Sequence, residues 1–397
     1  MDENTIRESR EDRLLHGVLL AYFINGWIGI FGSLLPFFRQ AYSLSYDQAG
    51  LMLSFRSVGN LVSMVLWGLL ALRLGRRRSI LLTVLMMVGC YALLASGWGT
   101  PALLMAVCLV EGTAMGCINN FSNTVISTLP GEKATRGFNL LHGVFAIGAF
   151  LSPLALVALT TLWPQQGWQV MTFGLCLLGL GQGLVYARME MPPEAGGEKG
   201  SAADLSFLRD KRFWLTTVML FFYLAVEYTI MGWLVTYFRD AGILSPRLAQ
   251  VMSSLLWLLM FLGRMVGAAV TGKVSRGAIL VVDAVGLLGF YLLMISSQSP
   301  VVVVIALAGV GAFMATLYPT AFAFGSDAIK GNDLGCSVMN LVGAVGGAIA
   351  PSLVGLAAER TGKIQSGMTL VAVGMILLLL SILVSLWSVR GEKKQSL

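Results

Sequence analysis

The sequence predicts an all-α membrane protein with 12 transmembrane helices in two pseudo-symmetric six-helix bundles. Composition, the length of the apolar runs and an internal repeat carry this prediction. Of the 397 residues, 56% are apolar and 12% are charged, and the mean hydropathy is +0.79. Such a low charge content is atypical of a soluble domain of this size. We therefore expect the chain to lie in a lipid bilayer.

Apolar runs long enough to cross a bilayer recur from Leu15 almost to the C-terminus. About 20 residues of helix span the hydrocarbon layer, whereas a β-barrel would show shorter segments of alternating polarity, which we do not find. The charged first fourteen residues lack the features of a cleavable signal peptide. The expected helices are 14–38, 47–72, 79–98, 101–127, 137–162, 168–187, 213–237, 247–271, 277–296, 300–325, 335–357 and 365–389.

Lys and Arg are distributed unevenly between the two sides of the predicted membrane. With the N-terminus inside, the cytoplasmic segments hold 20 of them and the external loops 5, while Arg56 and Arg264 lie within helices. The positive-inside rule then places both termini in the cytoplasm and the chain in the cytoplasmic (inner) membrane. The net charge of +7 is a topological signal and does not indicate a nucleic-acid partner.

The two halves of the chain repeat one another. LLPFFRQAYSLSYDQAGLM from Leu34 aligns without a gap with LVTYFRDAGILSPRLAQVM from Leu234, and the fifth helices of the two halves align from Asn139 and Asn340. Because both copies run in the same direction, the repeat is parallel, with its axis along the membrane normal. The expected domains are an N-terminal bundle 1–187, a flexible cytoplasmic linker 188–212 rich in Pro, Gly and charge, and a C-terminal bundle 213–397.

Ionisable side chains within the predicted helices are the first candidates for function. They cost several kcal/mol at mid-bilayer and usually face an aqueous cavity. Glu227, with Tyr223, Tyr228 and Trp233 nearby in sequence, suits a wet, aromatic-lined cavity and is the first candidate for ion or proton coupling.

A second set of charges lies in the second, fourth and eighth predicted helices. Glu111 and Arg56 lie at similar depth, which is compatible with either a structural ion pair or a coupling site. Arg264 lies towards the cytoplasmic end of its helix, where its side chain can reach water.

Amide side chains cluster in the fourth predicted helix at Asn119, Asn120 and Asn123, and others occur at Asn25 and Asn60. Amides both donate and accept hydrogen bonds, so they can recognise the hydroxyls of a sugar, while aromatic rings stack on its apolar face. They can equally hold helices together. His142 can carry a proton near neutral pH or serve as a packed, hydrogen-bonded side chain. The five cysteines lie in apolar segments without CxxC spacing, which favours helix packing over a disulfide or metal site.

Several segments together resemble the fucose–galactose–glucose permease branch of the major facilitator superfamily. They are LLPFFRQAYSLSYDQAGL, NLLHGVFAIGAFLSP, FFYLAVEYTIMGWLVTYF, FLGRMVG and LYPTAFAFGSD, and the similarity covers most of the chain. The resemblance implies the major facilitator fold and a sugar–cation symporter. It also implies a solute held midway between two lobes, bounded chiefly by helices 1, 4, 7 and 10, with contributions from helix 5.

Some positions depart from the pattern of that family. Gly32 and Asn119 stand where proton-coupled members of the branch have acidic residues, and Glu227 stands where they have an amide. The loop GLLALRLGRRR from Gly68 resembles the family's motif between helices 2 and 3, but Leu72 replaces the acid that helps to latch the outward-facing state. Its arginines either act in gating or only follow the positive-inside rule.

We therefore expect a secondary active transporter that moves a small polar solute, with a sugar as first candidate, by cation- or proton-coupled alternating access. The expected partners are the solute and the lipid bilayer, with no nucleic acid and a monomeric chain, and no cofactor apart from H+ or Na+ as coupling ion. The alternatives are an efflux antiporter for amphipathic drugs or metabolites, whose pocket aromatic and Met side chains can line, and a sensor without transport. No nucleophile or metal constellation predicts an enzyme.

The candidate site residues fall into three groups. The solute-binding candidates are Asn25, Asn119, Asn123, Tyr228, Trp233 and Tyr318. The candidates for ion or proton coupling are Glu227, Glu111 and His142. The candidates for a structural ion pair or for gating are Arg56, Arg76, Arg77 and Arg264.

Overall fold

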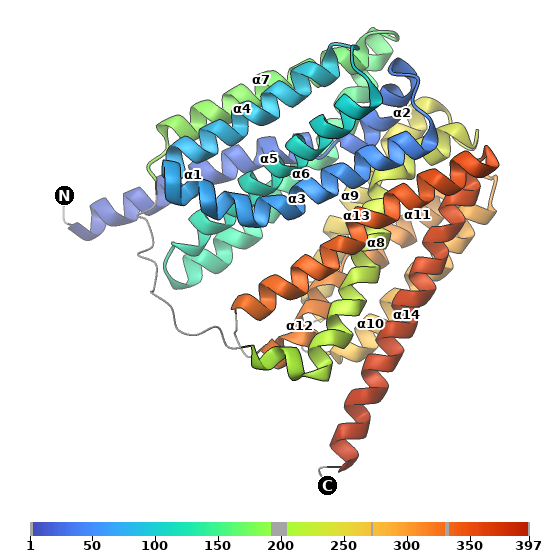
Figure 1. The fold of residues 1–397 in the computed structure, drawn as a ribbon. Coiled ribbons are helices and arrows are strands. Elements are labelled where there is room, and N and C mark those ends of the chain that lie inside the picture. Colours follow the sequence, from blue (N-terminus) through green and yellow to red (C-terminus); the bar gives the residue numbers. More distant parts are fainter. Residues whose placement is uncertain (1–2, 192–204, 271–272, 330–332, 396–397) are drawn as a thin grey trace. The chain divides into compact units, whose positions relative to one another are not determined.

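The protein consists of helices joined by short connections in the part of the chain that the structure describes, residues 3–191, 205–270, 273–329 and 333–395 of a computed structural model (Figure 1). In chain order the helices are α1 Glu3–Ile28, α2 Phe31–Ala41, α3 Tyr46–Leu74, α4 Arg76–Ala95, α5 Pro101–Ser127, α6 Gly131–Leu162, α7 Gly167–Arg188, the 3-10 helix η1 Ser206–Arg209, α8 Lys211–Asp240, α9 Pro246–Val270, α10 Arg276–Ser296, α11 Pro300–Met314, α12 Leu317–Ile329, α13 Asp333–Thr361 and α14 Ile364–Gln395.

Within the described residues, 12 helical segments are long and apolar enough to cross a membrane. This confirms the predicted number, and the bounds agree to within a few residues; the third span, for example, ends at Ala95 and not at 98. Large indole rings are exposed near the ends of spans: Trp98 is 73% and Trp387 is 77% exposed. Tryptophan is enriched at membrane–water interfaces, so these positions fit a chain that spans a bilayer.

The chain divides into two compact units, which are described separately. The first comprises Met1–Leu44 and Phe55–Gly197, and the second comprises Ser45–Ser54 and Glu198–Leu397. The first turns of α3 therefore belong to the second unit. Of the expected linker, residues 192–204 lie outside the described part of the chain, and η1 forms at its end. We call the end of a unit where α1 or α8 begins its entry end, and the opposite end its far end.

Helix α1 packs chiefly on α6 in the first unit, and α4 packs between α5 and α7. Figure 1 shows α4 and α7 side by side. Glycines allow the closest approach: a Cβ on Gly148 of α6 would lie 2.5 Å from the carbonyl oxygen of Phe23 in α1. Real Cβ atoms do not approach so closely, so α1 and α6 meet backbone to backbone at this point.

The second unit repeats these pairings. Helix α8 packs chiefly on α13, as α1 does on α6, and α10 packs on α11 and α14, as α4 does on α5 and α7. The glycine contact is repeated as well, because a Cβ on Gly346 of α13 would lie 2.1 Å from the carbonyl oxygen of Phe221 in α8. The repeat seen in the sequence therefore corresponds to a repeated pattern of helix packing.

Two of the spans are interrupted, although the sequence analysis treats each as one helix. The first breaks between Ile28 and Phe31, and the tenth breaks between Met314 and Leu317. In the tenth span the cause is local. Pro319 has no N–H to donate to the carbonyl of Ala315, and its ring crowds that carbonyl, so a regular helix cannot continue through this turn.

Candidate functional site

An ion pair between a half-buried guanidinium and a buried carboxylate joins α3 and α5 in the first unit. Arg56 Nε donates to Glu111 Oε2 at 2.6 Å and Arg56 Nη2 donates to Oε1 at 3.2 Å, so the contact is bidentate. Small residues bring the two backbones together here. A Cβ on Gly112 would lie 1.9 Å from the carbonyl oxygen of Arg56, and one on Gly59 would lie 2.1 Å from that of Leu109. The two glycines thus place the guanidinium directly against the carboxylate.

The neighbours of this ion pair complete its hydrogen bonding. Glu111 is fully buried, and the Tyr91 hydroxyl donates to its Oε1 at 2.9 Å. The Arg56 guanidinium lies 2.7 Å from Met115 Sδ and 5.0 Å from the centre of the Phe31 ring. With its charge balanced and three donors on its carboxylate, Glu111 is held in one arrangement. This favours the structural ion pair over the coupling site as its role.

A second polar cluster of the first unit surrounds Tyr22 of α1. The Tyr22 hydroxyl donates to Asn119 Oδ1, and its ring lies edge-on to His142, with 6.5 Å between ring centres. Asn25, one turn further along α1, is fully buried, yet neither amide atom has a hydrogen-bond partner among the described residues. A buried polar group without a partner costs about 1–3 kcal/mol. Among the described residues, no hydrogen bond offsets that cost for Asn25.

Glu227 lies at the centre of the polar cluster in the second unit. Its residue is 9% exposed, and its carboxylate interacts electrostatically with Tyr223 and with Arg264. The Tyr223 hydroxyl also donates to the carbonyl oxygen of Met314 at 3.0 Å. Met314 is the last residue of α11, so this bond occupies a carbonyl that the break in the tenth span leaves without a helical donor.

Tyr318 follows the same break and belongs to the same cluster. Its hydroxyl donates to Asn340 Oδ1 at 2.5 Å, and its ring centre lies 6.1 Å from that of Tyr223. Tyr228 is half-buried, and a Cβ on Gly347 of α13 would lie 2.4 Å from its ring. The cluster thus joins α8, α12 and α13, and it brings together three of the predicted site residues, Glu227, Tyr228 and Tyr318.

Two polar residues of the second unit escaped the sequence analysis. Asn340 begins the repeated segment of the fifth helix, but its bond to Tyr318 is not visible in a pattern. Asp283 of α10 is 8% exposed and accepts a hydrogen bond from Thr316. The sequence could have indicated Asp283, because it is a lone carboxylate within the apolar run ILVVDAVGLL. An ionisable side chain within a predicted span is the feature that made Glu227 a candidate.

Other predicted residues have specific structural contacts. The Trp233 indole is fully buried and donates to the carbonyl oxygen of Pro351 at 3.0 Å, which fixes α8 against α13. Arg77 donates to the carbonyl oxygens of Ala187 and Met189, both at 2.9 Å, and so caps the end of α7.

The remaining predicted residues differ in exposure. Asn123 and Arg76 are half-buried, and His142 and Arg264 are exposed. All five cysteines are free thiols, and no group of metal-ligating side chains occurs among the described residues.

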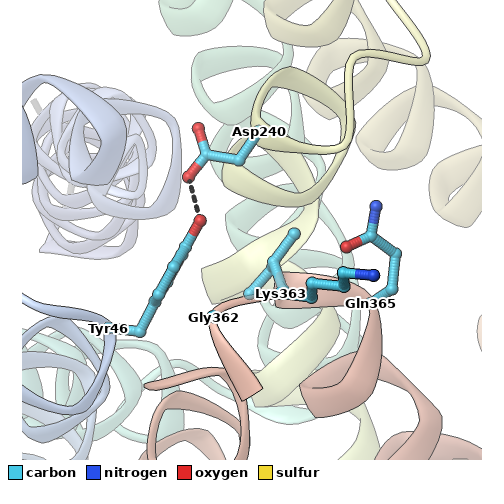
Figure 2. A pocket seen from close by; sticks show the side chains of 6 residues that line it. Tyr46, Asp240, Gly362, Lys363 and Gln365 are labelled. Carbon is cyan, nitrogen blue, oxygen red and sulfur yellow. Dashed lines mark hydrogen bonds between the residues drawn. The ribbon is translucent and has the colours of Figure 1, made fainter. Parts of the chain in front are cut away.

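A polar cavity of about 450 Å³ lies at the far end of the second unit. It is lined by Tyr46, Asp240, Gly362, Lys363, Ile364 and Gln365. Figure 2 shows the Tyr46 hydroxyl pointing at Asp240, to which it donates at 2.9 Å. The Tyr46 backbone N–H, at the start of α3, donates to the Glu359 carboxylate at 2.8 Å. None of the predicted solute-binding residues lines this cavity, and we do not assign the solute to it.

The sequence is similar to a family of transporters and to individual members of it. Residues 17–351 match the family described as the Major Facilitator Superfamily. The gentisate transporter of Corynebacterium glutamicum is 25% identical over 87% of this chain and 81% of its own length. The glucose/galactose transporter of Brucella abortus biovar 1 is 22% identical over 88% of each chain.

Two solved transporters share the fold. A variant of the nucleoside transporter NupG superposes with a TM-score of 0.76 at 14% identity, covering 94% of this chain and 99% of that one. The E. coli fucose:proton symporter FucP superposes with a TM-score of 0.62 at 18% identity, covering 94% and 97%. The predicted resemblance to the fucose permease branch is confirmed.

Proposed function

Since the chain belongs to the Major Facilitator Superfamily, and is a multi-pass membrane transporter and not an enzyme, we propose that it is a secondary active transporter. It moves a small polar solute, with a sugar as first candidate, across the cytoplasmic membrane by alternating access, coupled to H+ or Na+. The 20:5 distribution of basic residues supports an orientation with both termini in the cytoplasm. The protein acts as a monomer.

The hydrogen bonding around Tyr223 is the observation that carries coupling by Glu227. The Tyr223 hydroxyl donates its one proton to the Met314 carbonyl, and the neighbouring Glu227 carboxylate offers that proton a second acceptor. When Glu227 is ionised, it attracts this proton away from Met314. When Glu227 is protonated, it can itself donate to the Tyr223 oxygen, and Tyr223 then keeps its bond to Met314. The protonation state of Glu227 thereby decides whether Tyr223 keeps its hydrogen bond to Met314, at the break in the tenth span.

The choice of a sugar rests on amide chemistry and on the relatives. The unpartnered amide of Asn25 offers two donors and an acceptor, which suits a solute with adjacent hydroxyl groups. Names of similar proteins include glucose, galactose, fucose and nucleosides as transported solutes. Tyr318 and Asn340 present a hydroxyl and an amide in the second unit.

Two experiments in sequence test the proposal. A thermal-shift screen of the purified protein against hexoses, nucleosides, aromatic acids and amphipathic drugs first identifies a solute. Uptake and counterflow of that solute are then measured in proteoliposomes with Glu227→Gln. We expect loss of gradient-driven accumulation with counterflow retained, because exchange does not require the coupling step.

The matched control is Glu190→Gln, which alters an exposed carboxylate outside the spans that bonds Arg10 at 2.7 Å. This variant should accumulate solute like the wild type. Unchanged accumulation in Glu227→Gln would discard coupling by Glu227. A response to amphipathic drugs alone would replace sugar uptake by the efflux alternative.

A further inference from the structure

Asp283 is a buried carboxylate that the proposed function does not use. It lies in α10, within the ninth span, and is 8% exposed. The only hydrogen bond found for it among the described residues comes from Thr316. Glu111, by contrast, has a bidentate arginine and a tyrosine on its two oxygens. Asp283 therefore lacks the groups that normally offset the cost of a buried negative charge.

Thr316 lies in the two-residue break between α11 and α12. Its methyl group packs against α9, where a Cβ on Gly267 would lie 2.1 Å from Thr316 Cγ2. On the other side of the break, the Met314 carbonyl accepts the Tyr223 hydroxyl. The break is thus held by two side-chain bonds, one leading to Asp283 and the other to the neighbourhood of Glu227.

The two carboxylates also lie at the same level along their helices. Glu227 precedes Asp240, the end of α8, by thirteen residues, and Asp283 precedes Ser296, the end of α10, by thirteen residues as well. Both helices run from the entry end to the far end, so each carboxylate lies roughly 20 Å from the far end by the helical rise. The break in the tenth span is therefore flanked by two acids at one depth.

Few other charges face Asp283. Helix α10 packs on α11, α12 and α14. Among the described side chains of those helices within the spans, no basic or acidic group occurs. The titratable side chains are Tyr318 of α12, two residues after Thr316, and Tyr291 of α10 itself, two turns after Asp283. Arg276, two turns before Asp283 on α10 itself, donates to the carbonyl oxygen of Ala323 at 2.8 Å. No cation of the described protein is therefore bonded to this carboxylate.

We propose that Asp283 and Thr316 form a second cation site, which takes up a proton or a sodium ion and thereby sets the geometry of the break in the tenth span. An ionised Asp283 holds the Thr316 hydroxyl as its donor. A protonated Asp283 donates to the Thr316 oxygen instead, which frees the Thr316 proton for a carbonyl of its own helix. A sodium ion would be held by the Asp283 and Thr316 oxygens, since hard cations prefer oxygen ligands. The role of this site in transport rests on the proposed function, whereas its occupancy does not.

The test measures cation-dependent stability of the purified protein without any solute. Melting temperatures of the wild type, Asp283→Asn and Glu227→Gln are compared in sodium and choline chloride at matched ionic strength, across mildly acidic to mildly alkaline pH. A ligand that binds only the folded state raises the melting temperature. We expect the melting temperature of the wild type to rise with sodium or with acidification as Asp283 takes up its cation. Glu227→Gln should keep this rise, and Asp283→Asn should lose it.

A second pair of variants keeps the proposal testable if Asp283→Asn does not fold. Thr316→Ser retains the hydroxyl and should respond like the wild type, whereas Thr316→Val should need about tenfold more cation for the same stabilisation, a loss of about 1.4 kcal/mol. A response to sodium at fixed pH identifies sodium, and a response to acidification in choline identifies the proton. The site would be overturned if the melting temperature of Asp283→Asn responded to sodium and to acidification as the wild type does. Equal responses of Thr316→Ser and Thr316→Val would overturn it as well.

The same data separate this proposal from the proposed function. If Glu227→Gln transports normally while Asp283→Asn loses its cation response, coupling by Glu227 is wrong and the second site stands. If Glu227→Gln abolishes accumulation and Asp283→Asn retains the full cation response, coupling by Glu227 stands and the second site is wrong.

Discussion

The two units repeat one pattern of helix packing but treat their buried carboxylates in opposite ways. In the first unit, Glu111 is fully neutralised by Arg56, with Tyr91 completing its hydrogen bonds. In the second, Glu227 and Asp283 are bonded or close to hydroxyl groups, and Arg264, which acts on Glu227, is exposed. A hydroxyl can exchange donor and acceptor roles, whereas a bidentate guanidinium cannot.

This difference separates a structural charge from a functional one. A fully paired carboxylate stabilises the unit only while its partner is present, and the pair cannot be loaded and unloaded without a large cost. A carboxylate that faces hydroxyls near a broken helix can change state with a small rearrangement. We therefore expect substitutions in the first unit to act on stability, and those in the second to act on coupling.

The largest effect should follow from removing Arg56. Arg56→Leu leaves Glu111 buried without its counter-charge, which costs about 3–5 kcal/mol. Denaturant unfolding in detergent and expression level measure the loss. The double variant Arg56→Leu, Glu111→Leu should recover most of that stability, since no uncompensated charge remains. If the double variant is as unstable as Arg56→Leu, the ion pair is not what holds α3 to α5.

Glycine substitution tests the close contact between α3 and α5 that brings Arg56 next to Glu111. Gly112→Ala places a methyl group against the backbone of Arg56, where the carbonyl oxygen lies 1.9 Å from the new Cβ, and overpacking of this kind costs about 1–3 kcal/mol. Gly89→Ala is the matched control, because nothing lies within 4 Å of a Cβ at that position in α4. The control should gain about 0.5–1 kcal/mol from helix propensity. Equal melting temperatures for the two variants would contradict the close approach.

Asn25 tests whether a polar residue of the first unit is kept for function at a cost in stability. Asn25→Leu removes an amide that has no partner among the described residues and should stabilise the protein by about 1–2 kcal/mol. Binding of the solute found by thermal shift should weaken at the same time. Asn119→Leu is the comparison, because it removes the acceptor of the Tyr22 hydroxyl and should destabilise. Full solute affinity in Asn25→Leu would remove Asn25 from the binding site.

The number of spans and the repeat could be predicted from sequence because both depend on local composition. Apolar length alone defines a span, and LLPFFRQAYSLSYDQAGLM carries the repeat in its letters. The break at Thr316 was missed, although Pro319 signals it, because an apolar run conceals a two-residue interruption. The partners of Tyr318 and Trp233 could not be predicted, since they depend on how helices distant in sequence meet.

The smallest predicted effect lies in a pair of equivalent turns, where the repeat places Tyr42 opposite Gly242. Gly242 has a φ of +68°, which a glycine adopts without strain. In the first unit the residue with positive φ is Ser43, at 50°. The turn there is also held by the Tyr42 hydroxyl, which donates to the carbonyl oxygen of Leu94 at 2.8 Å. Loss of that bond in Tyr42→Phe should cost about 1 kcal/mol.

The effect of Tyr42 should depend on pH in one direction. Burial raises the pKa of the Tyr42 phenol above its usual 10.0. Because the folded state holds the proton more tightly than the unfolded state, the stabilisation is fully present below that ordinary pKa and is lost as the pH rises through the raised one. Melting temperatures of the wild type and Tyr42→Phe should therefore differ at neutral pH and converge in strong alkali. A difference that grows with alkali would mean that the phenolate is favoured in the folded state, and that this turn is held by charge and not by the hydroxyl bond.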